Sequence, residues 1–319
     1  YGAFRTANNE YTVMRYVSGT WFTNGAYVVN NCRRIELAVN DAHPGVCYGL
    51  STDPNGGFRN VFKSENSGQS WTEVTSSSGR PNYLYFTFDG LVNGQVPQGG
   101  QGWYDLAIAI SSKSKSIVTI GGINNWKTTD GGNTYKIKTF QQAWQGADQV
   151  HSDQHTLVYD SKGTLYVGND GGIYKSTDDG ENWTNISAGL NITQYYKFGQ
   201  ATDNKERLLA GAQDNGTMLK YNTTQWAATL GGDGFDCDID PNNSNIMYGS
   251  NFNQRSGVFY KSVNGGQSWG QQPMIYPFNP SINESSSWVS PLTIDENNSN
   301  IFVGYQNVYR STNQGSNWS

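Results

Sequence analysis

The segment Ser176-Thr177-Asp178-Asp179-Gly180-Glu181-Asn182-Trp183 decides the fold, because its pattern occurs five times in the chain. The pattern is Ser/Thr-x-Asp/Asn-x-Gly-x-x-Trp/Tyr, and the other copies are residues 64–71, 128–135, 262–269 and 311–318. A short Asp or Asn side chain can accept hydrogen bonds from nearby backbone N–H groups, and Gly can adopt a positive φ. We therefore predict that each copy, here called the turn motif, joins two antiparallel strands.

The spacing of the turn motifs predicts the architecture. They begin at residues 64, 128, 176, 262 and 311, which indicates a unit of roughly 40–50 residues. The longest interval equals two units, and Met218-Leu219-Lys220-Tyr221 followed by Trp226 indicates a degenerate copy at its middle. We expect inner strands starting near residues 34, 104, 154, 195, 235 and 288, and outer strands of one more unit in the first 30 residues.

A repeated unit of four short strands is the blade of a β-propeller. The sequence therefore predicts an all-β chain that forms a single propeller over residues 1–319. Seven blades are favoured and six are the alternative, because the last unit ends at its turn motif and the N-terminal segment can complete the ring.

The turn motifs resemble the Asp-box, or BNR repeat, of sialidases, of glycoside hydrolases of family 74 and of sortilin/Vps10-type receptors. Four middle segments are most similar to the BNR/Vps10-like propellers of large secreted bacterial proteins, namely residues 150–155, 166–176, 211–217 and 231–235. The resemblance implies a secreted or cell-surface protein whose relatives have diverse or unknown activities. Sialidases also need three arginines that grip the substrate and a Tyr/Glu nucleophile pair, and no arginine opens an inner strand in the middle units.

Composition excludes some classes of function. The chain has 319 residues, a net charge of −5 and only 15% charged residues, and it lacks the basic stripe of a nucleic-acid-binding protein. No apolar run is long enough for a membrane-spanning helix, so no membrane insertion is expected. The segment Tyr1–Arg5 begins partway through the repeat pattern, so we expect the chain to be a mature or trimmed part of a longer one.

The three cysteines, Cys32, Cys47 and Cys237, do not form a disulfide framework. Cys32 and Cys47 are predicted to lie at opposite ends of a hairpin, too far apart for an unstrained disulfide. Buried free thiols are the favoured interpretation, and a Cys32–Cys47 disulfide is the alternative.

The segment His151-x-Asp153-x-His155 holds two of the three histidines of the chain. On a strand, alternation would place all three side chains on one face. Two imidazoles and a carboxylate at that spacing can bind Zn²⁺ or another divalent cation. The alternative is that they form hydrogen bonds with neighbouring blades. No other cofactor is indicated.

Asp170 and Asp214 occupy matching Gly-rich turns in adjacent units. In family 74 hydrolases a Thr-Asp-x-Gly-Gly turn at this place carries a catalytic Asp, so the resemblance implies that role for Asp170, with Asp214 as its degenerate counterpart. Such a pair would act as acid and base of an inverting glycosidase. Asn169 departs from the family pattern, and the alternative is that both Asp residues cap glycine turns.

Propellers bind ligands at the mouth, where the inner strands begin. The candidate binding residues there are Asp153, Gln213, Asp233, Asp236 and Trp144, with Trp103, Trp126, Tyr195 and Tyr196 as further aromatics that either stack on sugars or pack. The sequence favours a module that binds a glycan or an extracellular protein, or serves as a scaffold. The alternative is an inverting endo-glycoside hydrolase of the family 74 type that acts on a polysaccharide.

Overall fold

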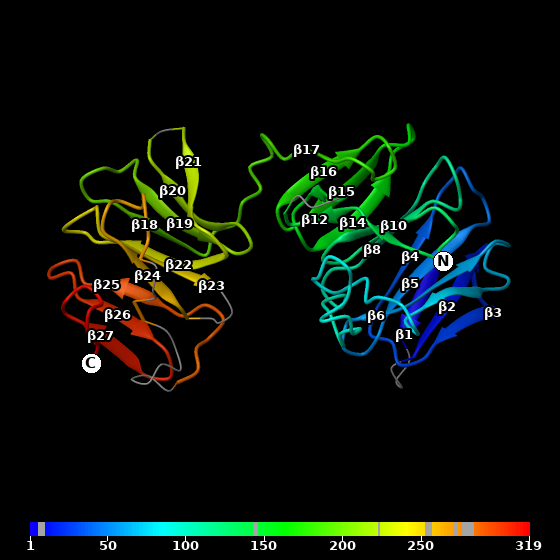
Figure 1. Cartoon of the computed structure of the whole chain (residues 1–319), viewed down its shortest axis with the longest axis horizontal. Helices are drawn as coiled ribbons and strands as arrows, with labels where there is room; N and C mark the ends of the chain where they lie inside the picture. Colours follow the sequence, from blue (N-terminus) through cyan, green and yellow to red (C-terminus); the bar gives the residue numbers. More distant parts are fainter. Residues whose placement is uncertain (6–9, 143–145, 223, 253–256, 271–273, 276–283) are drawn as a thin grey trace. The chain divides into compact units, whose positions relative to one another are not determined.

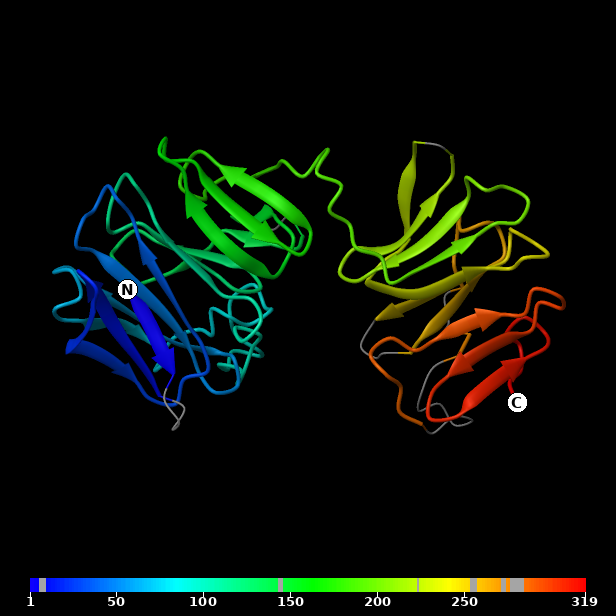
Figure 2. The ribbon, with the colours of Figure 1, turned by 180° about the vertical axis from the view of Figure 1, so that it is seen from behind.

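The computed structural model describes residues 1–5, 10–142, 146–222, 224–252, 257–270, 274–275 and 284–319. The chain forms two compact units, Tyr1–Asn191 and Ile192–Ser319, each of which is described by itself. In Figure 1 the first unit is coloured blue to green and the second yellow-green to red, and Figure 2 shows both from behind. Every element of the described residues is a strand, so the all-β prediction is confirmed.

The first unit contains one three-stranded and three four-stranded antiparallel sheets of consecutive strands, and one short parallel pair. The first two sheets are β1 (Gly2–Arg5), β2 (Tyr11–Val17) and β3 (Thr20–Val29), then β4 (Ile35–Val39), β5 (Cys47–Thr52), β6 (Phe58–Ser64) and β7 (Thr72–Ser76). The third is β8 (Ala107–Ile110), β9 (Val118–Gly121), β10 (Asn125–Thr128) and β11 (Lys136–Ile137). The parallel pair β12 (Thr139–Phe140) and β13 (Asp148–Gln149) precedes β14 (Gln154–Tyr159), β15 (Leu165–Asn169), β16 (Gly172–Ser176) and β17 (Thr184–Asn185).

The second unit contains three antiparallel sheets, again of consecutive strands. The first is β18 (Lys197–Gln200), β19 (Leu208–Ala212), β20 (Gly216–Lys220) and β21 (Trp226–Leu230). The others are β22 (Asp233–Ile239), β23 (Met247–Phe252) and β24 (Phe259–Ser262), then β25 (Leu292–Ile294), β26 (Ile301–Gly304) and β27 (Val308–Ser311). This up-and-down order is the order of strands in a propeller blade. Closure into a ring and the number of blades stay predictions.

The turn motif folds as its residue types predict. In residues 176–183, Ser176 Oγ accepts a hydrogen bond from Gly180 N at 2.8 Å, and Asp178 Oδ1 accepts one from Asn182 N at 2.9 Å. Gly180 has a φ of +83°. The same two bonds recur in the other four copies at 2.8–3.1 Å. The motif therefore satisfies its own backbone N–H groups and ends the third strand of the five sheets that carry it, at β6, β10, β16, β24 and β27.

The first strands of successive sheets lie side by side within each unit. In the first unit β8 contacts β4 and β14, and in the second β22 contacts β18 and β25. All six begin within a few residues of the predicted inner strands. Sheet β18–β21 lacks a turn motif, as predicted for the degenerate copy. Packing is closest where Gly211 of β19 meets the backbone of Phe235, since a Cβ at Gly211 would overlap the Phe235 carbonyl.

The core lies between successive sheets. Trp126 is buried among Tyr83 and Tyr135, which supports packing over ligand stacking for this tryptophan. The aromatic residues of the turn motifs, such as Trp183, pack against the same clusters. All three cysteines are buried free thiols, as favoured. In the part of the chain that the structure covers, no helix has the length and apolarity to cross a membrane.

Candidate functional site

Asp170 lies in the turn between β15 and β16, at the end of the sheet where β14 begins. The cap of this turn is Asn169, because its Oδ1 accepts a hydrogen bond from Gly171 N at 3.1 Å. The amide of Asn169 also donates to the carbonyl of His151 at 3.0 Å. The residue that departs from the family pattern therefore holds the turn, and the Asp170 carboxylate is left to contact other side chains.

Two side chains from neighbouring strands meet the Asp170 carboxylate. The hydroxyl of Tyr104, which precedes β8, donates to Oδ2 at 2.9 Å. The Nε2 atom of His155 in β14 lies 2.6 Å from Oδ1. The rings of Tyr104 and His155 pack edge to face with centroids 4.8 Å apart. Asp170 thus joins two adjacent sheets and fixes an imidazole and a phenol at their common end.

In the first unit the Asp153 side chain interacts with both Asp105 and Asp170, and the three residues are here called the carboxylate cluster. Carboxylate oxygens of Asp153 and Asp170 lie within 4.8 Å of each other. The Asp105 side chain faces that of Asp153 and is fully buried, with 0% exposure. Burial, and to a smaller extent the charge of Asp153, raises the pKa of Asp105 to about 9. Burial, and to a smaller extent the charge of Asp170, also raises the pKa of Asp153.

The prediction that residues 151–155 lie on one strand is wrong. Strand β14 begins at Gln154, and Asp153 has a φ of +67°, which interrupts the alternation of side chains. The ring of His151 lies against Gly171, where no Cβ could fit. His155 faces Asp170 instead. A metal site built from His151, Asp153 and His155 therefore lacks its predicted geometric basis and remains a hypothesis.

In the second unit, Tyr196, Gln213 and Trp288 gather over the buried ring of Phe235, and we call this set the aromatic platform. Gln213 Oε1 accepts hydrogen bonds from Tyr196 Oη at 2.6 Å and from Trp288 Nε1 at 3.4 Å. Both aromatic rings pack edgewise on Phe235, with centroids 5.6 and 5.2 Å away. Tyr196 nevertheless remains 48% exposed and Trp288 47% exposed. The platform therefore presents two oriented rings beside an amide.

Two of the predicted binding carboxylates, Asp233 and Asp236, contact the protein itself. Asp233 Oδ1 accepts a hydrogen bond from the backbone N–H of Asp214 at 2.8 Å. Asp236 is buried, forms an ion pair with Lys197 at 2.9 Å and accepts a hydrogen bond from Leu292 N at 3.0 Å. Asp236 therefore ties together β18, β22 and the start of β25.

The remaining predicted residues are placed as follows. Asp214 has a φ of +61° in the turn after β19, and it belongs to the second unit whereas Asp170 belongs to the first. The acid–base pair therefore stays a prediction. Trp144 lies outside the described residues. Sequence analysis missed Asp105 and Trp288, although the sequence holds a signal for both, since polar or aromatic residues precede the inner strands at these points.

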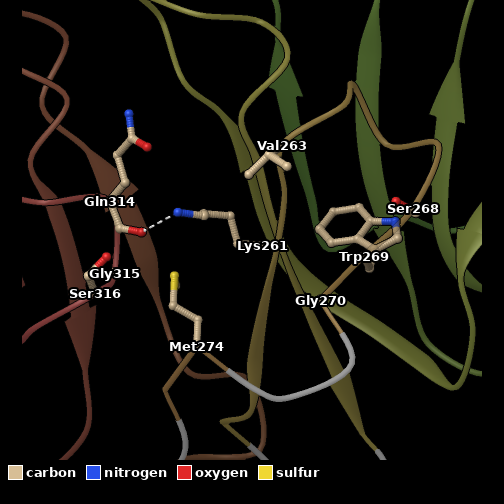
Figure 3. Close-up of a pocket in the computed structure, with 9 residues that line it drawn as sticks. All are labelled: Lys261, Val263, Ser268, Trp269, Gly270, Met274, Gln314, Gly315 and Ser316. Carbon is tan, nitrogen blue, oxygen red and sulfur yellow. Dashed lines mark hydrogen bonds between the residues drawn. The ribbon is translucent and has the colours of Figure 1, made fainter.

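A cavity of about 400 Å³ lies between the turn motifs of the last two sheets (Figure 3). It is lined by Lys261, Val263, Ser268, Trp269, Gly270, Met274, Gln314, Gly315 and Ser316. The Lys261 ammonium crosses it to donate to the carbonyl of Gln314 at 3.0 Å. Because the turn motifs themselves line this cavity, we attribute it to packing between sheets.

Comparison with known proteins identifies similar solved structures only. No family model matches the chain, and no curated protein matches it either. The GH74 enzyme of Niastella koreensis is 20% identical with a TM-score of 0.34, over 90% of this chain and 46% of the enzyme. The GH74 xyloglucanase of Xanthomonas campestris is 16% identical with a TM-score of 0.34, over 90% and 45%. The nidogen/laminin complex is 12% identical with a TM-score of 0.35, over 86% and 92%.

This chain spans less than half of the length of either GH74 enzyme. Such low identities and TM-scores do not transfer an activity, a substrate or a partner. The function of the chain must therefore be argued from its own side chains.

Proposed function

We propose that this chain is a secreted or cell-surface β-propeller module of the Asp-box type that binds a glycan. The observation that carries the proposal is the aromatic platform, in which Tyr196 and Trp288 stay about half exposed while their polar atoms are bound to Gln213. Aromatic rings present a broad apolar face, which suits the C–H face of a sugar ring. Fixing the rings in advance lowers the entropy cost of binding.

Gln213 supplies the polar part of the site. Its Oε1 accepts from both aromatic donors, so its amide nitrogen is the group oriented to donate to a sugar hydroxyl. Binding sites commonly combine apolar walls with a few such placed polar groups. An extracellular protein loop is the alternative occupant, and a purely structural scaffold is the outcome if nothing binds.

The proposal is tested by titrating the chain with a panel of soluble polysaccharides and by a glycan array. We expect Tyr196→Ala and Trp288→Ala each to weaken binding at least tenfold, which corresponds to about 1.4 kcal/mol. Tyr221→Ala is the matched control, because Tyr221 is comparably exposed, at 41%, but lies in the turn after β20. Binding that survives both platform substitutions, or that Tyr221→Ala weakens equally, would contradict the proposal. Trp144→Ala tests another aromatic candidate from the sequence in the same assay.

A second candidate function rests on Asp170, whose carboxylate contacts Tyr104 and His155. In this alternative the chain is an inverting endo-glycoside hydrolase of the family 74 type, with Asp170 and Asp214 as acid and base. Release of reducing ends from xyloglucan would be measured for the parent chain and for Asp170→Asn and Asp214→Asn. A parent chain without activity, or variants that keep full activity, would exclude this role.

A further inference from the structure

We propose that Arg33 and Trp103, which precede β4 and β8 in the first unit, form a second binding site, and that it takes the carboxylate of a uronic acid residue in an acidic polysaccharide. The aromatic platform lies in the second unit, and the Arg33–Trp103 site does not depend on glycan binding there. Neither residue belongs to the carboxylate cluster.

The first argument is the position of the Arg33 guanidinium. Its Cζ atom lies 5.3 Å from the centroid of the Trp103 ring, so the cation packs over the face of the indole. Arg33 is exposed, and none of the carboxylates in the described segments forms an ion pair with it. The planar N–H groups of a stacked guanidinium match the two oxygens of a carboxylate.

The second argument is that the protein holds Trp103 in place although its ring is 50% exposed. The ring lies against Gly56, where a Cβ would come within 2.7 Å of Trp103 Cδ1. The backbone before Trp103 is bonded to the same turn. Gly102 N donates to the carbonyl of Gly56 at 3.0 Å, and Gly100 N donates to that of Asn55 at 3.2 Å. An exposed ring that is fixed in this way binds a ligand at a low entropy cost.

The third argument is that the acidic side chains next to Arg33 are already bonded within the chain. Glu36 forms an ion pair with Arg34 at 2.8 Å. Asp53 follows Thr52, whose carbonyl accepts a hydrogen bond from Arg33 N. The Asp53 carboxylate accepts hydrogen bonds from two backbone N–H groups of its own turn, at 2.7 and 2.9 Å. The Arg33 cation is therefore available to a carboxylate from another molecule.

The choice of ligand follows from the second aromatic ring beside the cation. Tyr104 is 41% exposed, and its ring centroid lies 5.8 Å from that of Trp103. Arg34 donates to the Tyr104 carbonyl at 2.7 Å, and the Tyr104 hydroxyl is bonded to Asp170, so this residue is also fixed. A uronic acid offers a carboxylate to Arg33 and the C–H face of a ring to the aromatic side chains. A neutral sugar lacks the carboxylate, and an acidic side chain of a peptide lacks the ring.

The experiment titrates the whole chain with a short oligomer of galacturonic acid in a buffer of low ionic strength, and binding is followed by calorimetry. The matched ligand is the methyl ester of the same oligomer, which keeps the sugar rings and removes the charge. We expect the ester to bind at least about tenfold more weakly than the acid, because it cannot form the charged pair with Arg33. Added NaCl should weaken binding of the acid, since salt screens an exposed ion pair.

Arg33→Ala and Trp103→Ala should each weaken binding of the acid at least about tenfold. Arg33→Lys should weaken it by a smaller factor, because Lys keeps the charge and loses the planar fork. Lys162→Ala removes the same charge from an exposed position of the same unit and should change the affinity by less than about twofold. Tyr196→Ala should also leave it unchanged, which distinguishes a failure of this site from a failure of the aromatic platform. Circular dichroism establishes that each variant is folded, and the Arg33 variants suffice if Trp103→Ala is not.

Several results would each overturn the proposal. A parent chain that does not bind the acid, or that binds the methyl ester equally well, excludes a carboxylate site. Binding that survives Arg33→Ala places the carboxylate elsewhere, and binding that only Tyr196→Ala removes assigns the oligomer to the aromatic platform. A glutamate-rich peptide that binds as tightly, with the same dependence on Arg33, assigns the site to an acidic protein segment. A sulfated oligosaccharide that binds more tightly than the galacturonic acid oligomer assigns it to a sulfate ester.

Discussion

Ser176→Ala tests whether the turn motif stabilises the chain through its internal hydrogen bonds. Ser176 is 1% exposed. Its Oγ accepts from Gly180 N at 2.8 Å and donates to the Asp178 carboxylate at 2.8 Å. Removing the oxygen leaves the buried amide of Gly180 without a partner, which costs about 1–3 kcal/mol, and removes one hydrogen bond to a charged group. Since water can partly replace the second bond, we expect a total loss of about 2–4 kcal/mol.

The loss would be measured by urea unfolding at pH 7, followed by tryptophan fluorescence. Trp183 is a local probe, since its Nε1 donates to the carbonyl of Gly180 at 3.2 Å. The control is Ser161→Ala, an exposed serine of the same unit, which should change stability by less than about 0.5 kcal/mol. Ser64→Ala should cost about 1 kcal/mol less than Ser176→Ala, because its partner is the neutral Asn66. If Ser176→Ala matches the Ser161→Ala control, the reasoning is refuted.

Three further predictions concern other parts of the molecule. Burial raises the pKa of Asp178, but hydrogen bonds from Asn182 and Ser176 outweigh it and lower the pKa to about 2. The ionised carboxylate therefore contributes stability that is present above about pH 4 and is lost as the pH falls through about 2. Asp178→Asn should flatten the dependence of the urea midpoint on pH in that range. Gly211→Ala would drive a Cβ into the Phe235 carbonyl, so we expect the free energy of unfolding to fall by more than about 2 kcal/mol and glycan binding by the aromatic platform to weaken. In the same unfolding assay Gly231→Ala should be tolerated, because a Cβ at Gly231 meets nothing within 4 Å. Burial raises the pKa values of the Cys32, Cys47 and Cys237 thiols to about 11, 12 and 12, so Ellman's reagent should label them only after denaturation. Rapid labelling of the native chain would contradict their burial.

The strands and turns could be predicted because their causes are local. A turn motif satisfies its backbone with side chains four residues or fewer apart, so eight letters of sequence suffice to place it. The inner strands followed from the spacing of these motifs. The assignment failed at residues 151–153, since the positive φ of Asp153 breaks the strand pattern and leaves no trace in the residue types.

The candidate sites depended on tertiary structure. Sequence analysis selected Asp153 as a polar residue just before an inner strand, and Asp170 and Gln213 as polar residues of Gly-rich turns. It could not show that Asp170 contacts Tyr104, which is 66 residues away, or that Gln213 contacts Trp288, which is 75 residues away. Nor could it show that Asp105 is buried beside Asp153.

The sequence by itself thus determined an all-β chain of repeated antiparallel sheets, because a hydrogen-bonded turn of eight residues specifies its own conformation. Only the tertiary structure decided which side chains meet at the starts of the inner strands. Those contacts join different sheets, and they are set by how the sheets pack through close approaches such as that of Gly211 to Phe235. The carboxylate cluster and the aromatic platform are products of that packing.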